Sequence, residues 1–189
     1  MKRKYLASLL FILPILAHAD SGVKCNIVYT GDQDKWHGTE FSFMGILSGS
    51  YLYTCKDCGG VQINVSPASK SQSVYGFFSP SDFIKKTDSD YARKNISFME
   101  LNEFVGVNGS DVSIDEVGVA NFYPVGSENK YVFYKGKNKA KSGDYIERLG
   151  FVISNGQSSC SIIASGFGKK IPPAGIAGVD YFMNNINLY

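Results

Sequence analysis

The sequence predicts an α+β fold: a mainly antiparallel sheet, one short mid-chain helix, and a C-terminal helix packed on the sheet, stabilised by disulfides. Two observations indicate it. Much of the chain consists of short β-branched and aromatic segments separated by turn residues, and a helical stripe of apolar residues follows Pro172-Pro173. The 189 residues are 44% hydrophobic and 14% aromatic, which excludes a disordered chain, a collagen-like fibre and a coiled coil.

Alternating and β-branched segments predict the strands. In the first half these segments are Val23–Thr30, Glu40–Leu47, Tyr51–Thr54 and Val61–Val65. In the second half they are Ile96–Val105, Glu116–Tyr123, Lys130–Lys135, Tyr145–Ser154 and Ser158–Ala164. A polar loop is expected at Gly31–Thr39. Asn155-Gly156 supplies the two positive-φ residues of a tight hairpin turn, so the last two strands should pair antiparallel.

Two helices are expected. Ser79-Pro80-Ser81-Asp82 has a capping serine and a proline suited to the first helical position, so a helix should run to Lys86 and resume over 90–94. The C-terminal helix should bury its apolar stripe and turn its polar residues to water. The stripe is Ile176, Val179, Phe182, Met183 and Ile186, and the polar residues are Asp180, Asn184 and Asn187. The turn before this helix is expected at Ser165–Lys170.

The amino terminus has the three parts of a secretory signal peptide. Residues 2–4 are basic, an apolar run covers Leu6–Leu16, and Ala17–Ala19 offers a small-x-small cleavage site. The apolar run has about half of the roughly 20 residues that are needed to cross a bilayer. We therefore expect a signal peptide at 1–19 that is cleaved, a single globular domain at 20–189, and a periplasmic or secreted protein without a stable membrane anchor.

Removal of the signal changes the charge of the protein. The chain has 19 basic and 17 acidic residues, and three of the basic ones lie in the signal, so the mature part carries a net charge of −1. This balance gives no reason to expect nucleic acid as a partner. One basic run, Lys135–Lys141, holds four lysines in seven positions. Its glycine and asparagine predict a solvated hairpin loop, with an anion site as the alternative.

Four cysteines in an exported chain predict two disulfides. Cys55 and Cys58 are close enough in sequence to pair with each other, which leaves Cys25 with Cys160. The second bridge would close a loop of about 135 residues and, on the chain-entropy model, contribute about 4–5 kcal/mol. No cofactor motif is present, and one histidine in the mature chain is too few for a histidine-based metal site.

Cys55 and Cys58 also allow a second hypothesis, a thiol-disulfide redox protein. In such proteins the first cysteine begins a helix, whose dipole lowers the pKa of the thiol. Here Gly59-Gly60 and an alternating strand pattern follow. The sequence therefore favours a structural clip in a hairpin turn.

The only histidine of the mature chain, His37, limits the list of hydrolases. A Ser-His-Asp or Cys-His site would have to use it, and no Gly-x-Ser-x-Gly elbow exists. A hydrolase that uses His37 is thus an alternative, and no catalytic residues are assigned.

The function favoured by these observations is non-catalytic binding of another protein. An immunity or inhibitor protein that neutralises a toxin, or an envelope-assembly factor, would have these properties. The candidate binding loop has Trp36 as its aromatic anchor, because large aromatics give wide contact at low entropy cost. Its polar surround is Asp32, Asp34, Lys35, His37 and Glu40. The alternative is that Trp36 folds back and fills the edge of the core.

The disulfides give a first testable prediction. Mass spectrometry of the unreduced mature protein should find no free thiol, because both pairs are expected to be oxidised in the exporting compartment. Alkylation after reduction serves as the control and should label four cysteines. Four alkylated cysteines without reduction would contradict the disulfide assignment.

Overall fold

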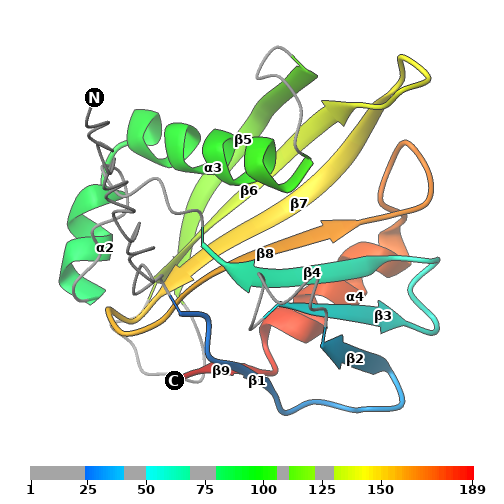
Figure 1. Ribbon diagram of the computed structural model, residues 1–189, viewed down its shortest axis with the longest axis horizontal. Helices are drawn as coiled ribbons and strands as arrows, with labels where there is room; N and C mark the ends of the chain where they lie inside the picture. Colours follow the sequence, from blue (N-terminus) through cyan, green and yellow to red (C-terminus); the bar gives the residue numbers. More distant parts are fainter. Residues whose placement is uncertain (1–23, 41–49, 69–79, 106–110, 122–129) are drawn as a thin grey trace, which may run out of the picture.

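The computed structural model describes residues 24–40, 50–68, 80–105, 111–121 and 130–189. The described part consists of a seven-stranded antiparallel sheet, a separate two-stranded sheet, and helices on both faces of the larger sheet (Figure 1). This architecture confirms the predicted α+β class. The predicted signal peptide and the segments 41–49, 69–79, 106–110 and 122–129 lie outside the described residues, and with them most of the expected strand Glu40–Leu47.

Within the described ranges, every pairing of strands is antiparallel. The order across the large sheet is β2 (Trp36–Glu40), β3 (Tyr51–Cys55), β4 (Gln62–Pro67), β8 (Ser159–Ser165), β7 (Tyr145–Ser154), β6 (Lys130–Lys139) and β5 (Val112–Asn121). In the small sheet β1 (Ile27–Tyr29) pairs with β9 (Ile186–Leu188). The predicted antiparallel pairing of β7 and β8 is confirmed. The turn lies one residue later than predicted: the Asn155 N–H donates to the Ser158 carbonyl at 3.1 Å, so Gly156, with φ 84°, and Gln157 form its tip. Asn155 Oδ1 accepts the N–H groups of Gln157 and Ser158 at 3.0 and 2.8 Å.

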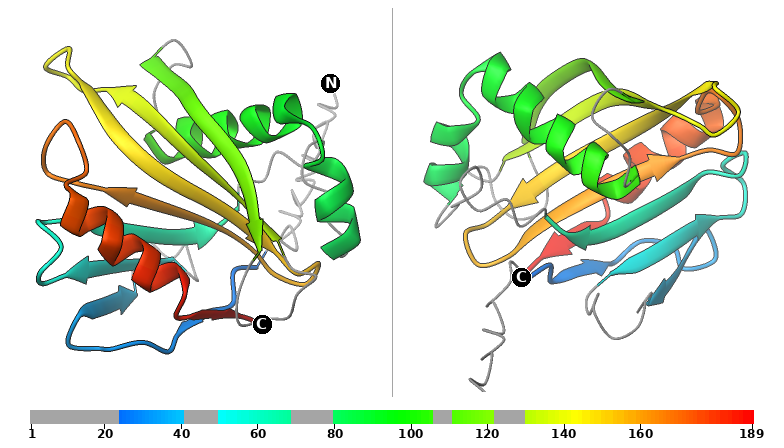
Figure 2. Two further views of the ribbon diagram at one scale, coloured as in Figure 1. Left: turned by 180° about the vertical axis from the view of Figure 1, so that it is seen from behind. Right: turned by 45° about the horizontal axis from the view of Figure 1, so that its top comes forward.

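Helices cover different parts of the two faces of the large sheet (Figure 2). α2 (Pro80–Lys86) and α3 (Asp90–Val105) pack on one face, mainly over β5 and β6. α4 (Pro173–Met183) packs on the other face, with β3, β4 and β8. Because successive side chains of a strand point to opposite faces, Val152 of β7 joins the α3 core while Phe151 and Ile153 join the α4 core.

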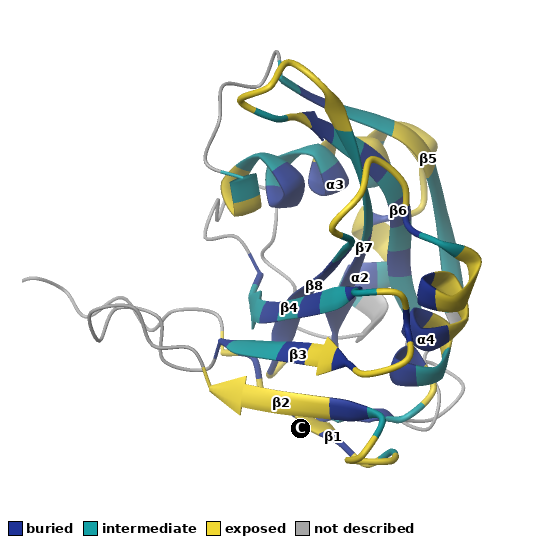
Figure 3. Ribbon diagram, turned by 90° about the vertical axis from the view of Figure 1, so that its right-hand side faces the viewer, coloured by how far each residue is buried: buried dark blue, intermediate teal, exposed yellow. Residues whose placement is uncertain are grey.

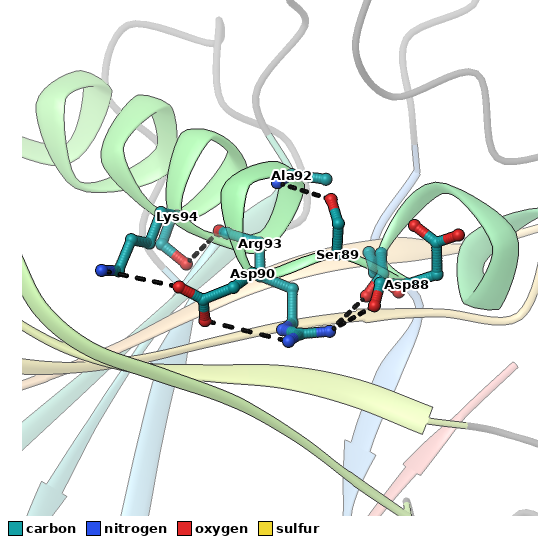
Figure 4. A network of polar contacts seen from close by, with 8 residues as sticks. Asp88, Ser89, Asp90, Ala92, Arg93 and Lys94 are labelled. Carbon is teal, nitrogen blue, oxygen red and sulfur yellow. Dashed lines mark hydrogen bonds and ion pairs between the residues drawn. The ribbon is translucent and has the colours of Figure 1, made fainter.

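Polar groups fix the junction between α2 and α3 (Figure 4). Ser89 Oγ accepts the Ala92 N–H at 3.2 Å and so caps α3. Arg93 donates from Nη1 to the carbonyls of Thr87 and Asp88 at 2.8 and 3.0 Å. Its guanidinium also pairs with Asp90 at 3.8 Å. These contacts turn the chain from α2 into α3 without a long loop.

The expected strand Ile96–Val105 is wrong, because α3 continues through it to Val105. The buried positions are Ile96, Ser97, Glu100 and Leu101. They follow the i, i+1, i+4, i+5 spacing of one helix face. Because two of these four buried residues are polar, the apolar residues alone do not repeat with the period of a helix. The sequence of this segment therefore resembles that of a strand.

Two expected loops are also wrong in part. β2 begins at Trp36, inside the expected loop Gly31–Thr39, and β6 extends to Lys139, inside the expected loop Lys135–Lys141. In β6 both neighbours hold the strand, since Gly136 pairs with Ile114 of β5 and Arg148 of β7. Pairing on both sides outweighs the weak strand preference of glycine and asparagine.

α4 forms where it was predicted, but its buried face is set by glycines. Val179, Phe182 and Met183 are buried as expected, whereas Ile176 is 42% exposed. Gly175 and Gly178 lie on the buried face, where a Cβ on Gly178 would meet the Sγ of Cys58. Close approach of α4 to the sheet therefore turns Ile176 outward.

The end of the predicted C-terminal stripe also differs. Ile186 belongs to β9 rather than to the helix, although it is buried. Asp180 and Asn184 face water as expected, while Asn187 is half-buried on β9.

Both predicted disulfides are present. Cys25 and Cys160 join the segment before β1 to β8, with Cα atoms 4.9 Å apart. Cys55 and Cys58 close the β3–β4 turn, with Cα atoms 5.4 Å apart. The turn then uses two positive-φ residues, Gly59 at 63° and Gly60 at 81°, which glycine adopts without a Cβ clash.

Phe182 is the aromatic centre of the α4 core. Its ring lies 4.8 Å from that of Tyr53, 5.1 Å from Tyr29 and 5.4 Å from Trp36. Phe182→Ala should lower the free energy of unfolding by about 3–5 kcal/mol, since it leaves a cavity among these rings. Urea denaturation measures it. The control is Ile176→Ala, which should cost less than about 1 kcal/mol because Ile176 is 42% exposed; equal losses would contradict the assigned face.

Candidate functional site

Trp36 is a structural residue. Its side chain is 0% exposed, and its indole Nε1 donates to the carbonyl of Gly178 in α4 at 3.2 Å. The prediction that Trp36 is presented to a partner is therefore wrong, and the alternative, in which it fills the edge of the core, is what the structure shows. The indole joins the edge strand β2 to α4.

The polar residues around Trp36 do not surround an exposed aromatic. Asp32, Asp34, His37 and Glu40 are exposed, and β2 is exposed beyond its buried start (Figure 3). Asp32 Oδ1 accepts the Asp34 N–H at 2.9 Å, which closes the turn. Lys35 Nζ lies 4.1 Å from the centre of the Tyr181 ring. A binding role for these residues stays a prediction, but without Trp36 as its anchor.

His37 lies opposite Thr54 in the β2–β3 ladder, exposed to solvent. Within the described ranges, no three His, Cys, Asp or Glu residues lie close enough to hold a metal ion.

The Cys55–Cys58 disulfide lies in the core. Cys55 and Cys58 are 7% and 2% exposed, and α4 covers the Cys58 sulfur at Gly178. Thiol-disulfide exchange requires a thiolate to reach one of the sulfurs. In this position the disulfide acts as a structural clip, and the redox hypothesis finds no support in its surroundings.

Three turns meet at one end of the large sheet, at the right of Figure 1. We call this the three-turn end; it comprises Lys56–Gly60 between β3 and β4, Lys139–Tyr145 at the β6–β7 hairpin, and Gly166–Lys170 between β8 and α4. Lys169 Nζ pairs with Asp144 at 2.8 Å, and the Lys169 carbonyl accepts the Glu147 N–H at 2.9 Å. The ring of Phe167 lies against Gly60. The Gly166–Lys170 turn is therefore in contact with each of the other two, and the views of Figure 2 show all three at the same end of the sheet.

The three-turn end presents aromatic and basic side chains. Phe167 is 83% exposed and Tyr145 is 46% exposed. The exposed charged residues are Lys56, Asp57, Lys139, Lys141, Asp144, Lys169 and Lys170, five cations against two anions. The mature chain as a whole has an expected net charge of −1. Positive charge is therefore concentrated at this end.

An open groove of about 550 Å³ continues from this end over β5, β6 and β7. Two ion pairs line it: Lys135 Nζ lies 2.8 Å from Glu147 Oε1, and Lys137 Nζ lies 3.3 Å from Asp115 Oδ1. Lys137 Nζ also lies 5.7 Å from the centre of the Tyr145 ring. The groove is therefore lined by both signs of charge beside an exposed aromatic.

Glu147 is held in its ionised form. Partial burial opposes ionisation, but hydrogen bonds from Lys135 and from the Ile171 N–H, at 2.9 Å, outweigh it and lower the pKa of the carboxyl below its usual value. A general acid needs a raised pKa to carry a proton at neutral pH. Glu147 therefore suits an acceptor of hydrogen bonds better than a catalytic acid.

Sequence reasoning placed a turn at Ser165–Lys170 but missed that it presents Phe167. The signal was available in the sequence, because Gly166 and Gly168 flank the phenylalanine and Lys169-Lys170 follow it. What the sequence could not show is that two other turns lie beside it.

Comparison with known proteins adds no family to these observations: neither the scan of protein-family models nor the search of curated proteins finds a match. In the described part of the chain, no helix is both long and apolar enough to span a bilayer. The case for function therefore rests on the residues themselves.

The Glu147 site gives a pH-dependent prediction. Because its folded-state pKa is lowered, Glu147 contributes stability above its unfolded pKa of about 4.3, and this stability is lost as the pH falls through the folded-state value. Glu147→Gln should thus cost roughly 1 kcal/mol at pH 7, a value discounted for the exposed lysine, and nothing at pH 2. Urea denaturation at both pH values measures it. The control Glu103→Gln removes an exposed carboxylate on α3 for which the described residues show no ion pair, and a similar pH dependence there would contradict the assignment.

Proposed function

We propose that this protein is an exported, periplasmic, non-catalytic protein that binds another protein, such as an immunity or inhibitor protein that neutralises a toxin or an envelope-assembly factor. The observation that carries the proposal is Phe167, whose side chain is 83% exposed in a loop between two glycines. Aromatic residues are enriched at the centres of protein interfaces, where their burial supplies much of the binding free energy.

The support beneath Phe167 favours an interface anchor. The ring rests against Gly60, in a turn that the Cys55–Cys58 disulfide closes. The adjacent Lys169 is tied to the β6–β7 hairpin through Asp144 and Glu147. A side chain backed in this way loses less conformational entropy on binding than one on a free loop, so more of the contact energy becomes affinity.

Two disulfides support an oxidising compartment, and the amino-terminal signal pattern supports export. The enzyme alternatives have less support. The Cys55–Cys58 bridge is covered by α4, and His37 lies on an exposed edge strand.

Capture of a partner tests this proposal. The tagged mature protein is cross-linked in cells of its source, purified from the envelope fraction, and compared with Phe167→Ala. The variant should lose the partner while its melting temperature stays unchanged, because little of the Phe167 side chain is buried. The matched control is Tyr91→Ala, since Tyr91 is 81% exposed on α3, away from the three-turn end, and should retain the partner.

Two results would contradict the proposal. One is the absence of any partner that the wild-type chain retains in the purified envelope fraction. The other is reduction of insulin disulfides by the purified protein that Cys58→Ser abolishes, which would establish a redox function.

A further inference from the structure

We infer that the three-turn end docks on an acidic protein surface, with Phe167 inserted among apolar residues of the partner and the surrounding lysines paired with its carboxylates. This inference rests on the proposed protein binding and adds the chemistry of the partner. The net charge of the mature chain is close to zero and by itself predicts neither an acidic nor a basic partner. The inference depends instead on the local charge of the three-turn end.

The lysines of the three-turn end are available for a partner. Among the described residues, only Lys169 of the five has a carboxylate within ion-pair distance, namely Asp144. The other four, all exposed, are Lys56, Lys139, Lys141 and Lys170. Exposed cations around an aromatic side chain attract a partner surface of negative charge, speed its approach and disfavour basic competitors.

The groove that Lys169 and Lys170 line matches a protein surface better than a membrane. Asp115, Glu116 and Glu147 line it together with Lys135 and Lys137. An anionic bilayer is flat and would meet these three carboxylates with repulsion, whereas a protein can place charges of either sign at the rim. One phenylalanine with a few lysines also falls short of the apolar face that an interfacial helix inserts into lipid.

The three turns that carry the basic and aromatic groups are joined by contacts. The Asp144–Lys169 ion pair, the Glu147–Lys169 backbone hydrogen bond and the Phe167–Gly60 contact join the three turns. The Lys135–Glu147 and Lys137–Asp115 pairs hold the groove lysines in place. A partner would therefore meet three turns that are already joined, so less of the contact energy is lost in ordering the loops.

Selection from a displayed library of random 12-residue peptides tests the inference on the immobilised mature protein. The enriched peptides should combine Asp or Glu with an aromatic or aliphatic residue. A synthetic copy of one such peptide should bind about tenfold or more weakly to Phe167→Ala and to Lys169→Glu/Lys170→Glu, and about tenfold more weakly when salt rises from 50 to 300 mM.

A charge-matched control separates local from overall electrostatics. Lys24→Glu/Lys85→Glu changes the net charge equally at exposed residues that lie outside the three-turn end, and it should alter peptide affinity less than about twofold. Thermal unfolding of every variant shows that the fold is kept.

Several outcomes would overturn the inference. Enriched peptides without acidic residues, or binding unaffected by Lys169→Glu/Lys170→Glu, would leave protein binding intact but refute the acidic partner. Co-sedimentation with phosphatidylglycerol vesicles that Phe167→Ala abolishes, without peptide enrichment, would assign the surface to lipid. Salt-sensitive self-association that Asp32→Lys/Asp34→Lys abolishes would assign it to a second copy of the chain. If no peptide is enriched and no envelope partner is captured, the proposed function itself fails.

Discussion

The close approach of α4 to the β3–β4 turn is the constraint on which the α4 side of the molecule depends. It requires glycine at positions 175 and 178: a Cβ on Gly175 would meet Val61, and a Cβ on Gly178 would meet the Cys58 sulfur and approach the Trp36 ring. At this contact the Gly178 carbonyl accepts the indole N–H of Trp36, which attaches β2 to α4. At Gly178 the helix thus contacts both the disulfide and the edge strand β2, and it covers the Cys58 sulfur.

The same contact explains why Trp36 is buried while Phe167 is exposed. With α4 drawn against the sheet, Trp36 and Phe182 share one core. The chain that leads from β8 into α4 must then pass over the β3–β4 turn, where Phe167 rests on Gly60. α4 therefore contacts the β3–β4 turn at Cys58 through Gly178, and the loop that precedes α4 contacts the same turn at Gly60 through Phe167.

The sequence was most informative where a residue type strongly favours one local structure. Asn155-Gly156 placed the β7–β8 turn to within one residue, Pro80 placed the start of α2, and elimination paired the four cysteines. It was misleading where burial mixes polar with apolar residues: Ser97 and Glu100 hide the inner face of α3. It also overrated exposure at Trp36, because the residue that buries the indole, Gly178, lies 142 positions away.

The candidate surface could not be found from the sequence for a related reason. Its residues come from three separate turns, and each turn alone resembles an ordinary solvated loop. Only the sheet order β4-β8-β7-β6 places the β8–α4 loop between the other two. Strand structure also determines where the lysines of β6 lie. Because side chains alternate along a strand, Lys135 and Lys137 line the groove while Gly136 lies beneath Leu101 of α3. The positive charge at this end is therefore brought together by the strand order of the sheet. The basic run Lys135–Lys141, seen in the sequence alone, is only part of it.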